Sequence, residues 1–587
     1  MSISSRLLEL VFAMLAGLGI LLLSVLYLAG RITPTSTLFA VVTLALALAS
    51  LLLPRGTEGA VPTFKAPFSL WLLPIVVYAV GVTELLLYGH TALGFLLILA
   101  VALLVTAYAR ERPFKKAMVA VAVVAVYLTS LYSFYAPSFG WDTWRDTIWA
   151  SRALQMGHIT GTTLRDISYP FPMVPTTYAV GSLISGLNAV WFSVVTGLMY
   201  LLQLPLLVFL LSRRFGGFDD FKGAFVLLMT PLVVNWSAGY LPQLYSLTVF
   251  LTAFLASYPL LQTPLLAAGV FGHGGVATWM VLTTTAIWIF ERRKVAIMLR
   301  ILIIIFAAYV IYTSVLYALF GGYSNVVKSV LVFLSGERIL VDVAPVSLPP
   351  TLALGNLAIS VLAVSGLLVF LHGRGSARAL AFLSGTFFVV SYIAAFAFPA
   401  SAIPRYLGIP STVMLAVFTP YAFELLRKRR YGSLYSLLLI IVVIFSFVLS
   451  GVFALRNPYT NNPYGGSISI GISYEDAQQL CMISQLLAPG TYLTDWLGGF
   501  FIANTYPDIQ LQYRRFGYRG IEFILGGSYG LYVDLAYLQS FRGLIILRQE
   551  SSITPGVYSP DVFVVAKNSS NSIFYSSNGI TVWTRQP

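Results

Sequence analysis

The 587-residue chain has very few cysteines, histidines and charged residues. Cys481 is the only cysteine, which excludes a disulfide within the chain and a metal site built from several cysteines. The four histidines, His90, His158, His273 and His372, are scattered and do not have the spacing of metal ligands. Charged residues make up 10% of the chain, whereas a soluble globular protein usually carries roughly 25%. This composition excludes an ordinary soluble domain.

Hydrophobic residues, in contrast, make up 58% of the chain and gather in long runs. A helix needs roughly 20 apolar residues to cross a bilayer, and runs of about that length recur. We count about fifteen, two of them short, and expect the first to be an anchor and not a cleaved signal peptide. The runs are Leu7–Ala29, Thr35–Leu53, Phe68–Leu87, Thr91–Ala109, Ala117–Tyr135, Ala189–Leu211, Gly223–Trp236, Leu244–Leu261, Pro264–Phe271, Gly275–Phe290, Ile301–Phe320, Thr351–Leu371, Ala379–Phe398, Leu407–Leu426 and Ser433–Phe453.

The positions of Lys and Arg between these runs predict the orientation of the chain. Up to the last run, alternate loops divide these residues 20 against 7, and the richer side is expected to be cytoplasmic. The N-terminus is then cytoplasmic and the C-terminus external, at the cell membrane. The net charge of +14 collects in the cytoplasmic loops, where it would meet anionic lipid headgroups. It therefore indicates a membrane partner and no nucleic-acid partner.

The sequence predicts a polytopic α-helical membrane protein with a small external C-terminal α/β domain. Residues 1–112 form an accessory region of four spans. Residues 113–455 form the catalytic membrane domain, with external loops at 136–188 and 321–350. After a linker rich in Asn, Pro and Gly, residues 456–587 alternate short apolar runs with turns. The expected elements there are a helix at Tyr474–Leu487 and strands at Thr491–Thr494, Ile521–Leu525, Leu544–Leu547 and Val562–Val565.

The polar stretch that follows the run Ala117–Tyr135 carries two acids, Asp142 and Asp146, among three aromatic or basic neighbours: Trp141, Trp144 and Arg145. A helix-like pattern continues from here to Gly157. After a further loop, Met173–Leu187 is apolar, but the charge count leaves no crossing for it, so it is expected to lie along the outer surface. An acid at the edge of a membrane is costly unless it is solvated, paired or used. These acids are therefore candidates for chemistry.

This arrangement resembles the GT-C superfamily of membrane glycosyltransferases, the mannosyltransferase, aminoarabinose-transferase and oligosaccharyltransferase group, which use polyprenyl-phosphate sugars. The likeness is carried by the run from Gly140 to Asp146 with Ala153–Gly157, and by Pro404-Arg405-Tyr406 with Pro410 at the start of a late span. It covers roughly residues 117–500. Where oligosaccharyltransferases carry Trp-Trp-Asp-Tyr-Gly, this chain has the different sequence Gly490–Gly499. The resemblance implies a superfamily and leaves the subfamily open.

The resemblance and the residue chemistry together imply roles at the outer membrane face. Asp142 would act as base or orient the acceptor, supported by Asp146. Arg405 would hold the lipid phosphate, because a guanidinium fork fits oxyanions. Mg²⁺ or Mn²⁺ would take oxygen ligands from Asp142, Asp146 and Asp166. The candidate substrate-binding residues are Arg405, Tyr406, Trp141, Arg145, His273, Glu337 and Arg338.

The sequence leaves other interpretations open. Asp142 could be a loop acid or a helix cap, Arg405 could reach towards phospholipid headgroups, and His273 could be a turn residue. A transporter or flippase for a lipid-linked polymer is the main alternative function, and a membrane scaffold that displays the external domain is another. The donor is expected to be a polyprenyl-linked glycan, and the acceptor an external protein, lipid or polymer. The identities of the sugar and the acceptor are left open.

Overall fold

The computed structural model of the chain is built almost entirely of helices. It describes residues 3–29, 34–54, 56, 63–88, 93–130, 135–136, 141–157, 172–230, 233, 237, 242–290, 292–319, 354–397, 407–456, 472–485, 492–494, 543–548, 572–576 and 580–585. The first five helices coincide with the first five apolar runs: α1 (Ile3–Leu28), α2 (Pro34–Leu52), α3 (Leu72–Tyr88), α4 (Leu93–Tyr108) and α5 (Pro113–Ser130).

Two helices, α6 (Trp141–Met156) and α8 (Met173–Ser185), occupy the predicted outer loop before the long α9 (Ala189–Gly216). Asn188 begins α9, since its side chain accepts a 2.9 Å hydrogen bond from the Trp191 amide. Gly186 and Gly217 end α8 and α9 in the left-handed conformation that glycine adopts most easily. The predicted helix end at Gly157 is confirmed, with φ at 72°.

Further helices follow in the order α10 (Lys222–Leu228), α12 (Pro242–Leu255), α13 (Pro259–Gly272), α14 (Gly274–Phe290) and α15 (Arg292–Leu319). Two of them differ from the apolar runs. The run Leu244–Leu261 is divided, because Pro259 starts α13 and the residue before a proline disfavours helix. In the run Gly223–Trp236, the helix α10 ends at Leu228. The last four membrane-type helices are α18 (Leu357–His372), α19 (Gly375–Ala397), α20 (Ile409–Arg427) and α21 (Gly432–Arg456).

Among the described residues, six helices are long and apolar enough to cross a membrane: α1, α5, α9, α15, α20 and α21. Eight shorter apolar helices accompany them, so the number of fifteen spans stays a prediction. Large apolar side chains are exposed along the outward face of α1, including Leu7 (63%), Met14 (67%) and Leu21 (62%). Such a face is explained by a lipid environment, since soluble proteins rarely expose long apolar patches.

One continuous apolar core joins the N-terminal helices to the rest of the bundle. It contains buried residues of α1 to α5 together with residues of α9 to α21. In this packing α2 contacts α18, α4 contacts α21 and α3 contacts α5. The division of the chain at residue 112 is a prediction that these contacts do not test.

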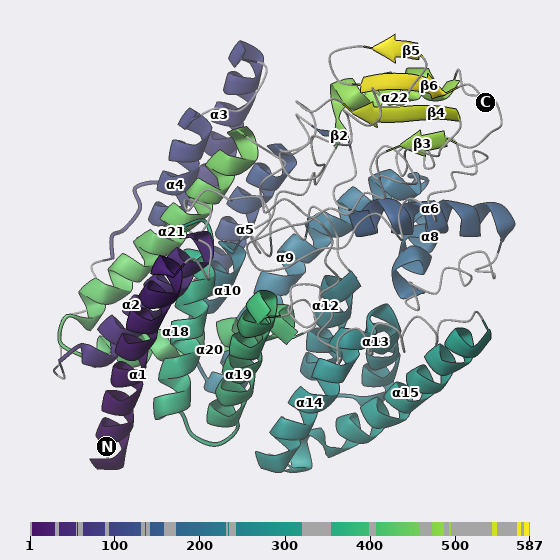
Figure 1. Ribbon diagram of the computed structural model, residues 1–587. Helices are drawn as coiled ribbons and strands as arrows, with labels where there is room; N and C mark the ends of the chain where they lie inside the picture. The colour runs from purple at the N-terminus through teal and green to yellow at the C-terminus, as the bar shows by residue number, and fades with distance from the viewer. Residues whose placement is uncertain are drawn as a thin grey trace.

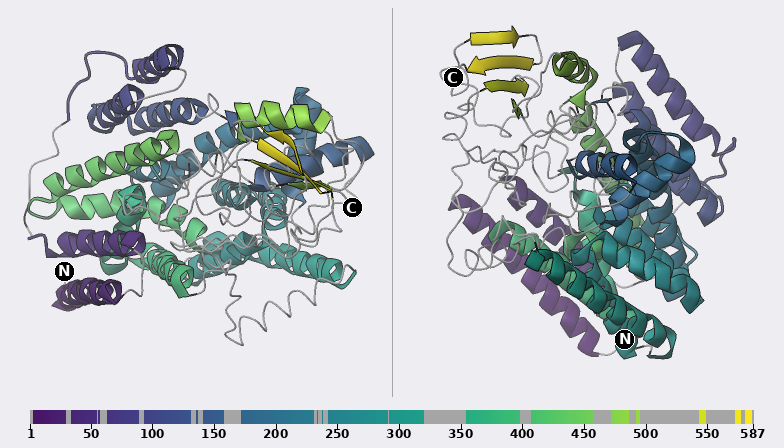
Figure 2. Two further views of the ribbon diagram at one scale, coloured as in Figure 1. Left: turned by 45° about the horizontal axis from the view of Figure 1, so that its top comes forward. Right: turned by 90° about the vertical axis from the view of Figure 1, so that its right-hand side faces the viewer.

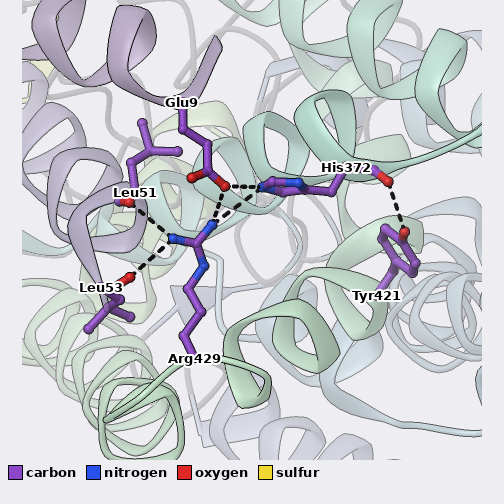
Figure 3. A network of polar contacts seen from close by, with 6 residues as sticks. All are labelled: Glu9, Leu51, Leu53, His372, Tyr421 and Arg429. Atoms are coloured by element: carbon purple, nitrogen blue, oxygen red, sulfur yellow. Dashed lines mark hydrogen bonds and ion pairs between the residues drawn. The ribbon is translucent and has the colours of Figure 1, made fainter. Parts of the chain in front are cut away.

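An ionic network fastens the first hairpin to this core (Figure 3). Arg429, after α20, reaches Glu9 of α1 at 2.5 Å and donates to the carbonyl oxygens of Leu51 and Leu53 at 3.0 and 3.2 Å. Nε2 of His372, at the end of α18, lies 2.9 Å from the same Glu9 oxygen. The three side chains are each only 8% exposed, so this is an interior connection.

The strands lie at the end of the bundle opposite the N-terminus (Figures 1 and 2). A mixed sheet has the order β3-β4-β6-β5, with β3 parallel to β4 and the other pairs antiparallel. Its strands are β3 (Tyr492–Thr494), β4 (Gly543–Arg548), β5 (Ser572–Ser576) and β6 (Ile580–Arg585), and α22 (Tyr474–Gln485) contacts β6. The predicted helix and two of the predicted strands, β3 and β4, are confirmed. The strands β5 and β6 were not predicted. The predicted strands 521–525 and 562–565 lie outside the described residues. That these elements form a separate domain stays a prediction.

A short ladder connects this sheet-bearing segment to the loop before α6. β1 (Tyr135–Ala136) pairs antiparallel with β2 (Ile472–Ser473), and α22 contacts both strands. Since α5 ends shortly before β1, its C-terminal end lies at the side of the bundle where the ladder and the sheet are found.

Candidate functional site

Helix α6 carries the acidic residues that the sequence analysis singled out. It begins at Trp141, so Asp142 lies in its first turn and Asp146 one turn later. Residues four apart lie on the same side of a helix. Together with α8, this helix lies at the end of the bundle where the sheet is found (Figure 1).

Asp146 is fully buried, which the sequence did not predict. Its exposed fraction is 0%, as are those of Thr143 and Thr147 on the same helix. The buried side of α6 packs against α8 and α9. A carboxylate removed from water is costly unless polar groups or charges compensate it, and Asp146 is not without a partner. Burial of this kind is a frequent property of groups that take part in chemistry.

A cluster of tyrosines adjoins the buried side of α6. Ala150, one turn after Asp146, packs with Tyr178 of α8, Tyr200 of α9 and Tyr245 of α12. The rings of Tyr200 and Tyr245 meet edge to face, with centroids 6.5 Å apart. The cluster brings four helices together at Ala150, and because its tyrosines are at most 7% exposed it is part of the interior packing that fixes α6.

His273 lies between α13 and α14 and is 4% exposed. Its Nδ1 accepts a hydrogen bond of 3.4 Å from the Val276 amide, which caps the start of α14. The flanking glycines are required by close packing, because a Cβ on Gly272 or Gly274 would overlap the side chains of α12 or Tyr309 of α15. This geometry explains His273 as a turn residue, and its contact with substrate stays a prediction.

Three polar side chains near these helices were not recognised as candidates from the sequence. Ser182 of α8 and Gln243 and Ser246 of α12 are buried, and the Oγ and Oε1 atoms concerned have no hydrogen-bond partner among the described residues. Unpaired buried polar atoms in a native fold call for an explanation, such as a bound water or a ligand. Hydrophobic periodicity gives no sign of unpaired hydroxyl or amide groups, so the sequence could not single out these three side chains.

Several predicted site residues fall outside what the structure describes. Asp166, Glu337, Arg338, Arg405 and Tyr406 lie outside the described residues. The backbones of Trp141, Asp142 and Arg145 belong to α6, but their side chains are not described.

Within the described residues, no group of three His, Cys, Asp or Glu side chains could hold a metal ion. Of the three predicted metal ligands, only the Asp146 side chain lies in that part of the chain. The site for Mg²⁺ or Mn²⁺ therefore stays a prediction.

No protein-family model and no curated protein matches the chain. Among solved structures, the chain is similar to a crystal structure of ArnT from Cupriavidus metallidurans in the apo state. The sequence identity is 12% and the TM-score is 0.32, over 79% of this chain and 96% of that chain. Values this low assign neither a family nor an activity, so the function has to be argued from the residues themselves.

Proposed function

We propose that the protein is a membrane glycosyltransferase that moves a sugar or oligosaccharide from a polyprenyl phosphate or diphosphate to an acceptor at the outer membrane face. One observation carries the proposal: the buried carboxylate of Asp146 lies one helical turn from Asp142, beside the tyrosine cluster Tyr178, Tyr200 and Tyr245. A pair of acids one turn apart on a helix can activate and orient an acceptor, as glycosyl transfer requires.

The transfer needs a base, or an orienting acid, for the acceptor. In the proposed step, an acceptor hydroxyl or amide attacks the anomeric carbon, and the bond from that carbon to the phosphate oxygen breaks. The polyprenyl phosphate leaves with the electron pair, and Asp142 takes the acceptor proton or orients the acceptor group. Asp146, with its side chain buried on α6, supports Asp142 by its negative charge.

The departing phosphate needs a cation. We assign this role to Arg405, with Tyr406 beside it, because a guanidinium group can donate two parallel hydrogen bonds to phosphate oxygens. Both residues lie just before Leu407 and α20. The apolar faces of the neighbouring helices would hold the polyprenyl chain. A Mg²⁺ or Mn²⁺ ion held by Asp142, Asp146 and Asp166 would supply further charge stabilisation.

The proposal is tested with purified full-length protein and a panel of polyprenyl monophosphate and diphosphate sugars. Because water can replace the unknown acceptor, the measured products are free sugar together with polyprenyl phosphate from the monophosphate donors or polyprenyl diphosphate from the diphosphate donors. We expect Asp142→Asn to lower this turnover by about a hundredfold or more, since general-base catalysis contributes that much. Asp146→Asn should cause a smaller loss, since its carboxylate acts through Asp142.

The matched control is Asp219→Asn. Asp219 is a carboxylate with a 61% exposed side chain in the segment between α9 and α10. It should leave turnover and folding unchanged. Wild-type turnover by a correctly folded Asp142→Asn variant would refute the assignment of Asp142, and the absence of turnover with every donor would refute the proposed reaction.

The alternative transporter reading calls for acids that exchange protons inside the bundle. The three acids near the ends of predicted spans have other contacts in the structure. Glu9 pairs with Arg429, Glu84 accepts a 3.1 Å hydrogen bond from the Phe95 amide, and Glu424 lies 3.4 Å from Arg427. These contacts give the three acids a structural role, and they do not support the transporter hypothesis.

A further inference from the structure

A second candidate site lies at the opposite end of the bundle from α6. Here a pocket of about 370 Å³ is formed where α4 and α20 end and where α5, α10 and α21 begin. The C-terminal end of α5 lies shortly before β1 of the β1–β2 ladder, so the pocket, at the N-terminal end of α5, is on the far side from the sheet. Its lining residues are Thr63, Ala107, Tyr108, Glu111, Pro113, Lys116, Asp219, Asp220, Phe221, Lys222, Phe423, Glu424, Arg427, Ser436, Leu437 and Ile440.

Lys116, in the first turn of α5, is the unusual member of this lining. It is 8% exposed. Its Nζ donates one hydrogen bond of 2.6 Å to the Ala107 carbonyl oxygen and lies 4.3 Å from the centre of the Phe221 ring. Within the described part of the chain, no carboxylate lies at ion-pair distance from this ammonium group. Asp220 attracts the ammonium group from beyond ion-pair distance, and Lys222 repels it. A buried cation without an ion pair is costly, and the ammonium group has three N–H donors, of which the structure uses one.

The four carboxylates of the pocket are engaged with other bases. Glu111 lies 2.7 Å from Lys115, and Asp219 lies 3.5 Å from Arg213. Asp220 pairs with Lys222. Glu424 lies 3.4 Å from Arg427 and 3.8 Å from Lys428. The lining itself carries four carboxylates and three bases, and the further bases Lys115, Arg213 and Lys428 pair with these carboxylates from around the pocket. Among the described residues of the pocket, Lys116 is the base that forms no ion pair.

A second group in the lining also lacks a partner. The Oγ atom of Ser436, near the start of α21, is buried and makes no hydrogen bond with any described residue, and the residue is only 4% exposed. Apolar and aromatic side chains complete the lining, among them Phe221, Phe423 and Leu437. The pocket therefore combines a buried unpaired cation and a free hydroxyl with apolar walls.

We propose that this pocket binds a phosphate-bearing ligand, with Lys116 and Ser436 contacting the phosphate oxygens. A phosphate oxygen would supply the missing anion for Lys116 and accept a hydrogen bond from Ser436. The apolar walls and the position at the ends of the helices favour the headgroup of a membrane phospholipid over a soluble phosphate. The site is separate from the glycosyl-transfer residues and does not depend on the proposed function.

The experiment measures ligand binding to the full-length wild-type protein in detergent. One arm adds dioleoylphosphatidylglycerol, a second adds dioleoylphosphatidylserine, and a third adds inorganic phosphate. Native mass spectrometry counts retained lipid, and the midpoint of thermal unfolding reports binding, because a ligand that binds only the folded state raises it. A response to the two lipids supports the site with a lipid source. A response to inorganic phosphate alone supports it with a soluble source.

The decisive variant is Lys116→Met, which keeps the length of the side chain and removes its charge. The control is Lys428→Met. It removes a cation at the same end of the bundle, but the side chain of Lys428 is 68% exposed. Since charge-assisted hydrogen bonds are worth about 1.5–3 kcal/mol, we expect Lys116→Met to weaken binding by about tenfold or more. The control should change binding by less than about threefold.

Ser436→Ala provides a test that does not alter charge, and it should weaken binding by a smaller factor. Lys116→Arg should retain most of the binding. Equal losses in Lys116→Met and Lys428→Met would show a general charge effect and overturn the proposal. So would a wild-type protein that responds to none of the three probes. If Lys116→Met fails to fold, the other two variants decide. The phosphate contact is overturned if Ser436→Ala binds as well as wild type and Lys116→Arg loses binding.

Discussion

At the scale of single residues, Arg429 forms an interior ionic contact with Glu9 and His372. The guanidinium group also donates to the carbonyl oxygen of Leu51, in the last turn of α2, and to that of Leu53, just after the helix. Orphan carbonyls at a helix end need donors, and a cation there also interacts favourably with the helix dipole. One side chain from after α20 therefore holds both helices of the N-terminal hairpin.

Replacing Arg429 by Met is expected to destabilise the protein by about 3–5 kcal/mol, because it leaves the Glu9 carboxylate buried without its main partner. The measurement is thermal unfolding of the purified variant in detergent. Lys428→Met is the control, as its exposed side chain pairs only at 3.8 Å with Glu424, which also has Arg427. Equal stability of the two variants would contradict the interior role of Arg429.

Arg405 is a residue-scale prediction that rests on the sequence and on the proposed function. Arg405→Ala should raise the KM for the polyprenyl-phosphate donor, because losing one partly desolvated phosphate contact costs about 2–4 kcal/mol. Arg405→Lys should recover part of this, as a point charge without the guanidinium fork. Steady-state kinetics at varied donor concentration provide the measurement. An unchanged KM in Arg405→Ala would mean that the arginine only meets headgroups.

At the scale of elements, α10 is a short helix that is held in place by close contact with neighbouring helices. This seven-residue helix is buried from Gly223 to Leu228 and packs against α9 and α20. Gly223 makes the contact possible, since a Cβ there would overlap the carbonyl oxygen of Ala416 in α20. Small residues allow helix backbones to approach in this way inside membranes.

Gly223→Ala is therefore expected to destabilise the protein by about 1–3 kcal/mol, as overpacked cores do. The comparison variant is Gly385→Ala in α19, where a Cβ would have nothing within 4 Å. That variant should change stability by less than about 1 kcal/mol, and in the stabilising direction, because alanine favours helix. Both are measured by thermal unfolding, and a Gly223→Ala variant as stable as wild type would contradict the close packing of α10 on α20.

At the scale of the whole molecule, the sheet-bearing segment is connected to the region of α6 as well as to α21. The β1–β2 ladder joins Tyr135 and Ala136, which precede α6, to Ile472 and Ser473. The segment could therefore influence how α6 is presented to an acceptor. In the proposed function, its task is to select that acceptor.

Deleting residues 457–587 should leave binding of a polyprenyl-phosphate sugar intact, because the described core of the bundle lies outside this segment. Transfer to the natural acceptor should be lost, while slow hydrolysis of the donor continues. Donor binding is measured with the purified truncated protein, and transfer with wild-type membranes as acceptor source. Failure of the truncated protein to insert or to bind donor would show that the segment is part of the core fold. The missing Trp-Trp-Asp-Tyr-Gly pattern further predicts no preference for Asn-X-Ser/Thr peptides.

The sequence by itself determined where most helices lie, because apolar length and chain-breaking residues are local properties. The apolar runs mark α1 to α5, Gly157 marks the end of α6, and the polar stretch after α5 marks α6 itself. The sequence analysis missed the division of an apolar run at Pro259 and the early end of α10. The short helix α10 is stabilised by packing against its neighbours, which a sequence pattern does not show.

Only the tertiary structure decided which side chains are buried and which of them have partners. The burial of Asp146, the pairing of Glu9 with Arg429 and the unpaired Lys116 each depend on residues far away in the chain. The β1–β2 ladder likewise joins segments separated by more than half the chain. Charge and periodicity could identify Lys116 as one of many basic residues at a helix end. Its lack of an anion follows from the packing of α5 against its neighbours, which no local pattern contains.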